Sequence, residues 1–124
     1  MTRRRLVVVG NGMAGARFVE NVINGDRERQ FEIVVFGDEP HGNYNRILLS
    51  GVLAGTHCTD DIMINPLACY AENGVHLHAG TRVERLDLSG RVVHGGGVTE
   101  PYDVLVLATG SRPVVPPIRL RLKL

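Results

Sequence analysis

The sequence predicts an α/β fold in which a parallel sheet is flanked by helices and joined by a small antiparallel β-meander. Three observations predict it. A short apolar run leads directly into the glycine motif at residues 10–15, and a stretch at helical spacing follows. Residues 31–36 and 102–108 are apolar runs typical of strands buried in a parallel sheet. Residues 81–100 alternate between apolar and polar side chains and are broken by glycine turns, as antiparallel strands are.

Composition and charge exclude several classes of protein. The 124 residues suffice for one domain with a single core, and 44% hydrophobic with 22% charged residues is ordinary for a globular protein. A net charge of +1 gives no basis for nucleic-acid or membrane-surface binding. The two cysteines, Cys58 and Cys69, are too few for a disulfide scaffold, and no apolar stretch is long enough for a membrane span. We expect a cytoplasmic protein without nucleic-acid or membrane partners.

The first strand, turn and helix predict a dinucleotide-binding site. Residues 6–9 form the strand, G-N-G-M-A-G the turn, and residues 16–23 the helix. In this order, Gly10 allows a sharp turn, Gly12 lets the backbone approach a diphosphate, and Gly15 lets the helix pack closely on the sheet. The unpaired N–H groups of the first helical turn favour an anion. The alternative is a tight strand-to-helix turn without a ligand.

Two carboxylates follow the second strand. Residues 31–36 are rich in β-branched and aromatic side chains, and Asp38 and Glu39 come soon after them. A carboxylate about 20 residues beyond a glycine turn is placed to bind the ribose hydroxyls of an adenosine. Both residues qualify, with Asp38 slightly preferred. The alternative is a solvated acidic turn before Pro40.

An irregular loop is expected at residues 41–45, and residues 46–54 are compatible with a short helix. Arg46 has two interpretations. A guanidinium at this point could bind two oxygens of a diphosphate at once, or the residue could be an ordinary surface arginine. The residues alone do not decide between them.

Further along, residues 59–61 are typical of a helix N-cap with acidic residues in the first turn. We expect the helix to begin at Ile62 or Pro66 and to end at Glu72. Its apolar side chains are expected to pack rather than to bind a ligand.

His76 and His78 share one face of a strand predicted at residues 75–78. A His-x-His pair can bind a metal ion, but no acidic or cysteine partner is close in sequence. The preferred interpretation is a partly exposed strand face, and no metal site is predicted.

The meander is predicted from residues 81–88, 91–94 and 98–100, which are separated by Ser89-Gly90 and by three glycines. A buried parallel strand at residues 102–108 follows. It ends in small residues where the backbone could again approach a ligand.

Four features occur in one order along the chain. They are GNGMAG after the first strand, the acidic end of the second strand, Tyr44-x-Arg46 with Leu49-Ser50, and L-A-T-G-S-R-P at residues 107–113. Together they resemble the FAD-binding domain of the pyridine-nucleotide-dependent flavin oxidoreductases, a glutathione-reductase-like group with ferredoxin and rubredoxin reductases among its relatives. FGDEPHGNYNRILLSGVLAG looks most like the N-terminal flavoprotein segment of the NAD(P)H-dependent assimilatory nitrite reductase large subunit. The resemblance covers residues 4 to about 118.

The resemblance implies a Rossmann-like FAD-binding domain and gives each part of FAD its protein contacts. The glycine turn would hold the pyrophosphate and Asp38 or Glu39 the adenosine ribose, while Arg46 would contact the diphosphate or lie beside the flavin. The backbone of Val83 would face the adenine, and residues 108–110 would close over the middle of the cofactor. The implied cofactor-binding residues are Gly10, Gly12, Met13, Ala14, Gly15, Asp38, Glu39, Arg46, Val83, Ala108, Thr109 and Gly110.

The resemblance also limits the chemistry expected of this chain. The first helix and the loop after it contain no Cys-x-x-x-x-Cys pair, which argues against a disulfide reductase. In the intact family a hydride passes from NAD(P)H to the flavin, so the chemistry belongs to the cofactor, and no catalytic residue is predicted here. A rubredoxin- or ferredoxin-reductase-like flavoprotein and a non-catalytic nucleotide-binding remnant are the alternatives.

We expect residues 1–118 to be the N-terminal part of a FAD-binding domain that is incomplete at its C-terminus, and residues 119–124 to be an atypical tail. The NAD(P)H-binding and acceptor domains that the resemblance implies are missing from this sequence. An incomplete domain would expose an apolar sheet edge, so we also expect self-association.

Overall fold

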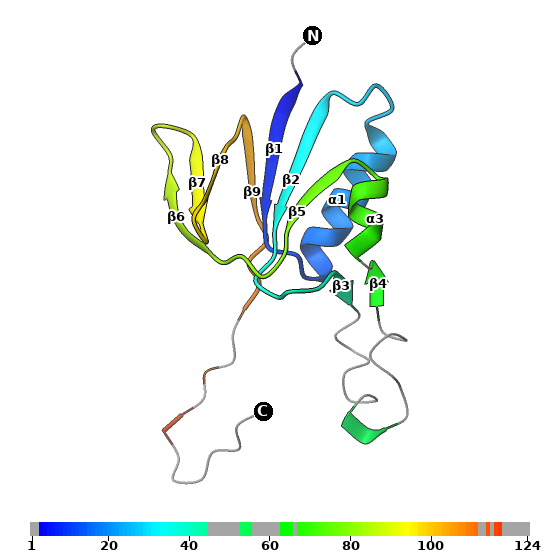
Figure 1. The fold of residues 1–124 in the computed structure, drawn as a ribbon, viewed down its shortest axis with the longest axis vertical. Helices are drawn as coiled ribbons and strands as arrows, with labels where there is room; N and C mark the ends of the chain where they lie inside the picture. The colour runs from blue at the N-terminus through cyan, green and yellow to red at the C-terminus, as the bar shows by residue number, and fades with distance from the viewer. Residues whose placement is uncertain are drawn as a thin grey trace.

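A four-stranded parallel sheet forms the centre of the structure (Figure 1). The computed structural model describes residues 3–44, 53–55, 63–65, 67–111, 114 and 116–117. Across the sheet the strands run in the order β5-β2-β1-β9. Their bounds are Val75–His78 for β5, Phe31–Phe36 for β2, Arg4–Val9 for β1 and Val104–Leu107 for β9. The predicted parallel sheet is confirmed.

The two middle strands are buried on both faces. Val7 and Val8 of β1 are completely buried, and Val34 and Val35 of β2 are at most 1% exposed. Val7 pairs with Val34 on one side and with Leu105 of β9 on the other. Strands covered on both faces need continuous apolar runs, which explains why these segments show no alternation in the sequence.

Two helices cover one face of the sheet (Figure 1). α1 (Met13–Gly25) follows the glycine turn and is longer than the predicted residues 16–23, while α3 (Leu67–Glu72) precedes β5. Both helices contribute to a buried apolar cluster on this face. The cluster contains Leu6, Val8, Val19, Ile33, Val35, Tyr70 and Val75.

The antiparallel meander packs on the opposite face of the sheet. Its strands are β6 (Val83–Asp87), β7 (Val92–Gly95) and β8 (Val98–Pro101), in the order β6-β7-β8. Val93 of β7 is completely buried against the other face of the same two middle strands. The predicted meander is therefore confirmed, with each strand within two residues of its expected bounds.

Glu100 of β8 joins the meander to the sheet. Its carboxylate accepts a hydrogen bond from the Arg5 guanidinium of β1 and lies 3.1 Å from His78 Nε2 of β5. The side chains of Glu100 and His78 are only about 15% exposed. His78 also stacks on Phe36, with ring centroids 4.9 Å apart, and its ring lies 4.6 Å from that of His76. The two histidines do share a face, and the described residues contain no group of three His, Cys, Asp or Glu side chains that could hold a metal ion.

A short ribbon between β2 and α3 was not predicted. β3 (Asn43–Tyr44) pairs with β4 (Met63–Asn65) in an antiparallel manner. The start of the helix at Ile62 is therefore wrong, whereas a start near Pro66 agrees with α3. A residue that precedes a proline favours extended backbone, which explains why Asn65 belongs to a strand. The predicted helix at residues 46–54 falls largely, and the N-cap at residues 59–61 entirely, outside the described residues.

The prediction that residues 102–108 form a buried parallel strand is also wrong in part. β9 is a parallel strand as expected, but in the described part of the chain its only partner is β1. Its side chains are half-buried, and Leu107 is 59% exposed. No helix among the described residues is long and apolar enough to cross a membrane.

Candidate functional site

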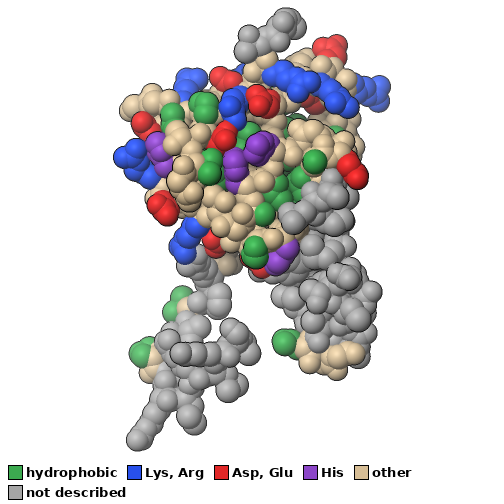
Figure 2. Space-filling model, in the orientation of Figure 1, with side chains coloured by type: hydrophobic (Ala, Val, Ile, Leu, Met, Phe, Trp, Pro, Cys, Tyr) green, Lys and Arg blue, Asp and Glu red, His purple; other side chains and the backbone are tan. Residues whose placement is uncertain are grey.

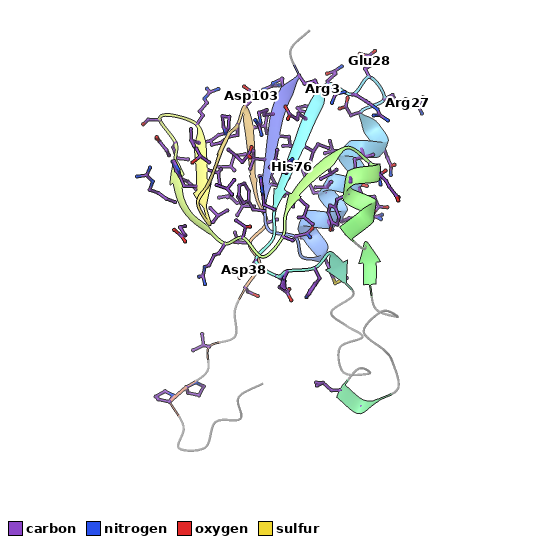
Figure 3. All side chains as sticks on the ribbon, viewed as in Figure 1. Arg3, Arg27, Glu28, Asp38, His76 and Asp103 are labelled. Carbon is purple, nitrogen blue, oxygen red and sulfur yellow. The ribbon has the colours of Figure 1, made fainter. Side chains whose placement is uncertain are left out.

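A cleft of about 580 Å³ lies where β1, β2 and β9 end. It is lined by residues 10–14 of the β1–α1 turn, by Gly37, Asp38, Glu39, His41 and Gly42 beyond β2, and by residues 108–111 beyond β9. Asp38 marks this end of the sheet in Figure 3. In Figure 2, charged side chains gather at the opposite end, where Figure 3 labels Arg3, Arg27 and Glu28. Carboxyl ends of parallel strands are where α/β sheets bind ligands.

Gly10 and Gly15 are required by the close packing of the turn. Gly10 has φ +114°, and a Cβ there would lie 2.0 Å from the carbonyl oxygen of Ala108. A Cβ on Gly15 would lie 2.3 Å from the carbonyl oxygen of Gly10. The Gly10 N–H donates to the Phe36 carbonyl at 2.9 Å, and the Ala108 N–H donates to the Val9 carbonyl at 2.8 Å. The turn is thus held between the ends of β2 and β9.

Gly12 differs from these two glycines because the fold leaves free space where its side chain would be. It is the N-cap residue of α1 with φ −78° and ψ −165°, a conformation open to any residue. A Cβ on Gly12 would meet nothing within 4 Å. No side chain caps the helix, and its first turn carries no acidic residue. Backbone donors at the start of a 13-residue helix, next to free space, suit a diphosphate.

The segment beyond β2 brings two carboxylates and a histidine to the cleft. Asp38 is exposed, and the Glu39 carboxylate lies 3.3 Å from His41 Nε2. His41 Nδ1 donates to the Gly42 carbonyl at 3.0 Å, which holds the ring beside Glu39. The segment is anchored at Gly37, whose N–H donates to the His78 carbonyl and whose carbonyl accepts from Thr81. Asp38 and Glu39 both remain candidates for binding a ribose.

Most of the predicted site residues meet in this cleft. Its lining includes Gly10, Gly12, Met13, Ala14, Asp38, Glu39, Ala108, Thr109 and Gly110. Gly15 lies buried behind the turn, and Val83, which pairs with Gly95 in the meander, is not among the lining residues. Arg46 lies outside the described residues. The roles of Val83 and Arg46 stay predictions from the resemblance.

Several lining residues were not predicted. Five such residues line the cleft: Asn11, Gly37, His41, Gly42 and Ser111. Asn11 lies inside the motif GNGMAG and Ser111 inside L-A-T-G-S-R-P, so both motifs indicate that these residues are near the site. His41 belongs to the stretch FGDEPHGNYNRILLSGVLAG that carries the resemblance, but its place beside Glu39 depends on how the chain turns after β2.

Comparison with known proteins agrees with this geometry. Residues 4–121 match the family described as pyridine nucleotide-disulphide oxidoreductase. The chain belongs to this family. The match extends over both strands that end in the glycine turn and the Ala108 segment, so the whole cleft lies within the family's sequence pattern.

Individual proteins show which members of the family this chain is similar to. The chain is 47% identical over 119 residues to the assimilatory nitrate reductase electron transfer subunit of Bacillus subtilis, and 44% identical over 119 residues to the NAD(P)H nitrite reductase of the same organism. Each alignment covers 95% of this chain and 15% of the relative. The chain therefore spans about 15% of the length of these relatives.

A solved structure shows the same fold. The covalent putidaredoxin reductase–putidaredoxin complex matches with a TM-score of 0.84 at 28% sequence identity. The match covers 94% of this chain and 28% of the other. The Rossmann-like fold with its antiparallel meander is thus shared with this reductase complex.

Proposed function

We propose that this chain is the FAD-binding portion of an NAD(P)H-dependent oxidoreductase of the nitrite reductase large-subunit type. The observation that carries the proposal is the open cleft at Gly12, where uncapped backbone donors of α1 face free space between the ends of three parallel strands. The likeness to the two Bacillus subtilis proteins supports the choice of subfamily. FAD, when bound, supplies the redox chemistry by accepting a hydride from NAD(P)H and passing electrons to an acceptor.

The residues of the chain bind and orient this cofactor. The backbone of the turn around Gly12 and the N-terminus of α1 hold the pyrophosphate. Asp38 or Glu39 accepts hydrogen bonds from the adenosine ribose, and residues 108–110 close over the middle of the molecule. Arg46, which would contact the diphosphate or the flavin, and Val83, which would face the adenine, complete the proposed set.

The same proposal includes the other domains, the self-association and the cellular location of the chain. Residues 1–118 are the N-terminal part of the FAD-binding domain, and NAD(P)H-binding and acceptor domains complete the electron-transfer route. The side chains of β9 are only partly buried, which supports self-association of the 124-residue chain. The proposed location is the cytoplasm, where NAD(P)H is available.

A rubredoxin- or ferredoxin-reductase-like flavoprotein is the second candidate. Its support is the structural likeness to the putidaredoxin reductase complex. The identity of 28% in that match is well below the 44–47% shared with the nitrate and nitrite reductase proteins, which favours the first candidate. Both candidates predict FAD binding in the same cleft and differ only in the electron acceptor.

A flavin titration of the purified chain tests the proposal. We expect FAD to bind with one molecule per chain, seen as a change of flavin fluorescence, and more tightly than NAD in a competition experiment. Riboflavin, which lacks the pyrophosphate and the adenosine, should bind far more weakly. A folded chain that binds no FAD would contradict the proposal and favour a non-catalytic module.

A further inference from the structure

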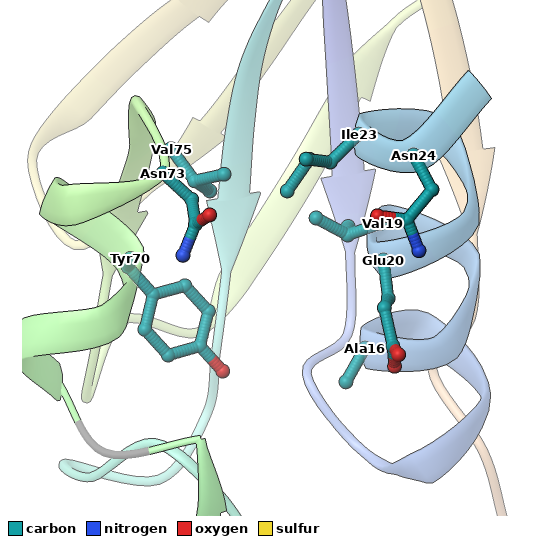
Figure 4. Close-up of a pocket in the computed structure, with 8 residues that line it drawn as sticks. All are labelled: Ala16, Val19, Glu20, Ile23, Asn24, Tyr70, Asn73 and Val75. Atoms are coloured by element: carbon teal, nitrogen blue, oxygen red, sulfur yellow. The ribbon is translucent and has the colours of Figure 1, made fainter. Parts of the chain in front are cut away.

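The glycine turn is contacted by a tyrosine from the core. Tyr70 lies on α3, 59 residues away along the chain, and is 8% exposed. Its ring packs with Val19 and Val75 in the cluster on the helix face, and Figure 4 shows it lining the groove between α3 and α1. Its hydroxyl donates a hydrogen bond to Asn11 Oδ1 at 3.0 Å. A residue without any part in the cleft thereby reaches into the turn that lines it.

Asn11 links the turn to the segment beyond β2. It stands between Gly10 and Gly12 and lines the cleft. A Cβ on Gly37 would lie 3.2 Å from Asn11 Cβ and 3.7 Å from Asn11 Nδ2, so the side chain lies directly against Gly37. Gly37 is followed by Asp38 and Glu39, the two candidate ribose ligands. The Asn11 carboxamide is therefore held between α3 and the backbone that leads to these carboxylates.

The hydrogen bond from the Tyr70 hydroxyl matters because the glycine turn can adopt many backbone conformations. Glycines flank Asn11 on both sides, and glycine populates many backbone conformations. The Tyr70 ring packs in the buried cluster on the helix face, which restricts where its hydroxyl can lie. Removing the hydrogen-bond partner of a nearly buried hydroxyl also costs free energy. A contact that restricts the free turn to its binding conformation lowers the entropy lost when a ligand orders it.

We propose that Tyr70 is a positioning residue for the cofactor site, acting through Asn11 to hold the glycine turn in the conformation that binds the pyrophosphate. The inference rests on the proposed FAD site. It adds a specific residue of α3 to that site, although Tyr70 itself does not line the cleft.

Tyr70→Phe is the direct test, because it keeps the ring in the core and removes only the hydroxyl. We expect the Kd for FAD to rise about tenfold, the effect of losing one good hydrogen bond. The midpoint of thermal unfolding should change by only a few degrees. Tyr102→Phe is the matched control. This half-buried tyrosine packs on the other face of the sheet, against the buried cluster of Val7, Val9, Val34, Phe36 and Val93, and its variant should bind FAD like the wild type.

A double-mutant cycle separates positioning from a general packing effect. If Tyr70 acts through Asn11, Asn11→Ala raises the Kd by a similar factor, and the combined Tyr70→Phe and Asn11→Ala variant binds no more weakly than Asn11→Ala alone. Independent effects would multiply instead. ADP provides a second probe, since it contains the diphosphate and the ribose but no flavin. Its affinity should fall by the same factor in Tyr70→Phe.

The outcomes distinguish this inference from the function on which it rests. Wild-type FAD affinity in a folded Tyr70→Phe variant overturns the positioning role and leaves the FAD site intact. A cycle in which the two effects multiply also overturns it. If Tyr70→Phe does not fold, Asn11→Ala decides: wild-type affinity overturns the inference, and a tenfold loss supports it. A wild-type chain that binds neither FAD nor ADP overturns the proposed function and the positioning role together.

Discussion

Three glycines of one motif have different physical roles. A side chain on Gly10 or Gly15 would collide with backbone atoms, whereas one on Gly12 would enter the open cleft. The first two glycines are therefore needed by the folded chain itself, and Gly12 is needed only if a ligand occupies the space beside it. This difference allows the stability of the fold and the binding of a cofactor to be tested separately.

Gly15→Ala should destabilise the protein. The new Cβ would lie 2.3 Å from the Gly10 carbonyl oxygen, so α1 and the turn must move apart, which typically costs about 1–3 kcal/mol. Urea unfolding followed by circular dichroism measures the loss. Gly25→Ala is the matched control, because a Cβ at that end of α1 meets nothing within 4 Å. Its free energy of unfolding should be unchanged or slightly raised, and equal losses in the two variants would argue against close packing at Gly15.

The two candidate ribose ligands are separable by substitution. Asp38→Asn should raise the Kd for FAD about tenfold, because hydrogen bonds to a charged acceptor are worth about 1.5–3 kcal/mol. Glu39→Gln should have a smaller effect, since the Glu39 carboxylate lies beside His41 in the structure. Both affinities are measured by flavin titration. The reverse order would assign the ribose to Glu39 and leave Asp38 as a surface residue of the turn.

At the scale of elements, Glu100 of the meander contacts two strands of the parallel sheet. Its carboxylate lies between Arg5 and His78, and all three side chains are largely shielded from solvent. Glu100→Gln should lower the free energy of unfolding by about 1–3 kcal/mol, because a shielded Arg5 loses its charged partner. Chemical denaturation measures this loss. Glu84→Gln on the exposed face of β6 is the control, and a similar loss there would mean that Glu100 has no special part in joining the layers.

The same scale shows what the sequence could and could not predict. β1, β2 and α1 were predictable because their signals are local: continuous apolar runs, a glycine motif and helical spacing. The β3–β4 ribbon was not, since Asn43 pairs with Asn65, which is distant in the sequence, and neither strand exceeds three residues. In the site, the turn and both carboxylates were predictable from spacing. The His41–Glu39 and Tyr70–Asn11 contacts were not, because they depend on how distant segments meet.

For the whole molecule, we expect the edge of β9 to determine whether the chain associates with itself in solution. In the described residues β9 pairs only with β1, and Leu107 at its end is 59% exposed. An uncovered strand edge with apolar side chains favours pairing with a second copy. We expect sedimentation velocity to show concentration-dependent association that Leu107→Lys weakens. Leu88→Lys, at a 70% exposed leucine beyond β6, should leave it unchanged. A monomer at all concentrations would contradict this expectation.

The central claim is that the glycine turn binds the FAD pyrophosphate, and titration of FAD into Gly12→Asp tests it most directly. An aspartate is a favourable N-cap residue for α1, and its Cβ would meet no protein atom within 4 Å, so the fold should be preserved. Its carboxylate would stand where the phosphates are proposed to bind. We predict that FAD binding is lost, while Gly25→Asp at the other end of α1 binds normally. Wild-type affinity in a folded Gly12→Asp variant would contradict the account.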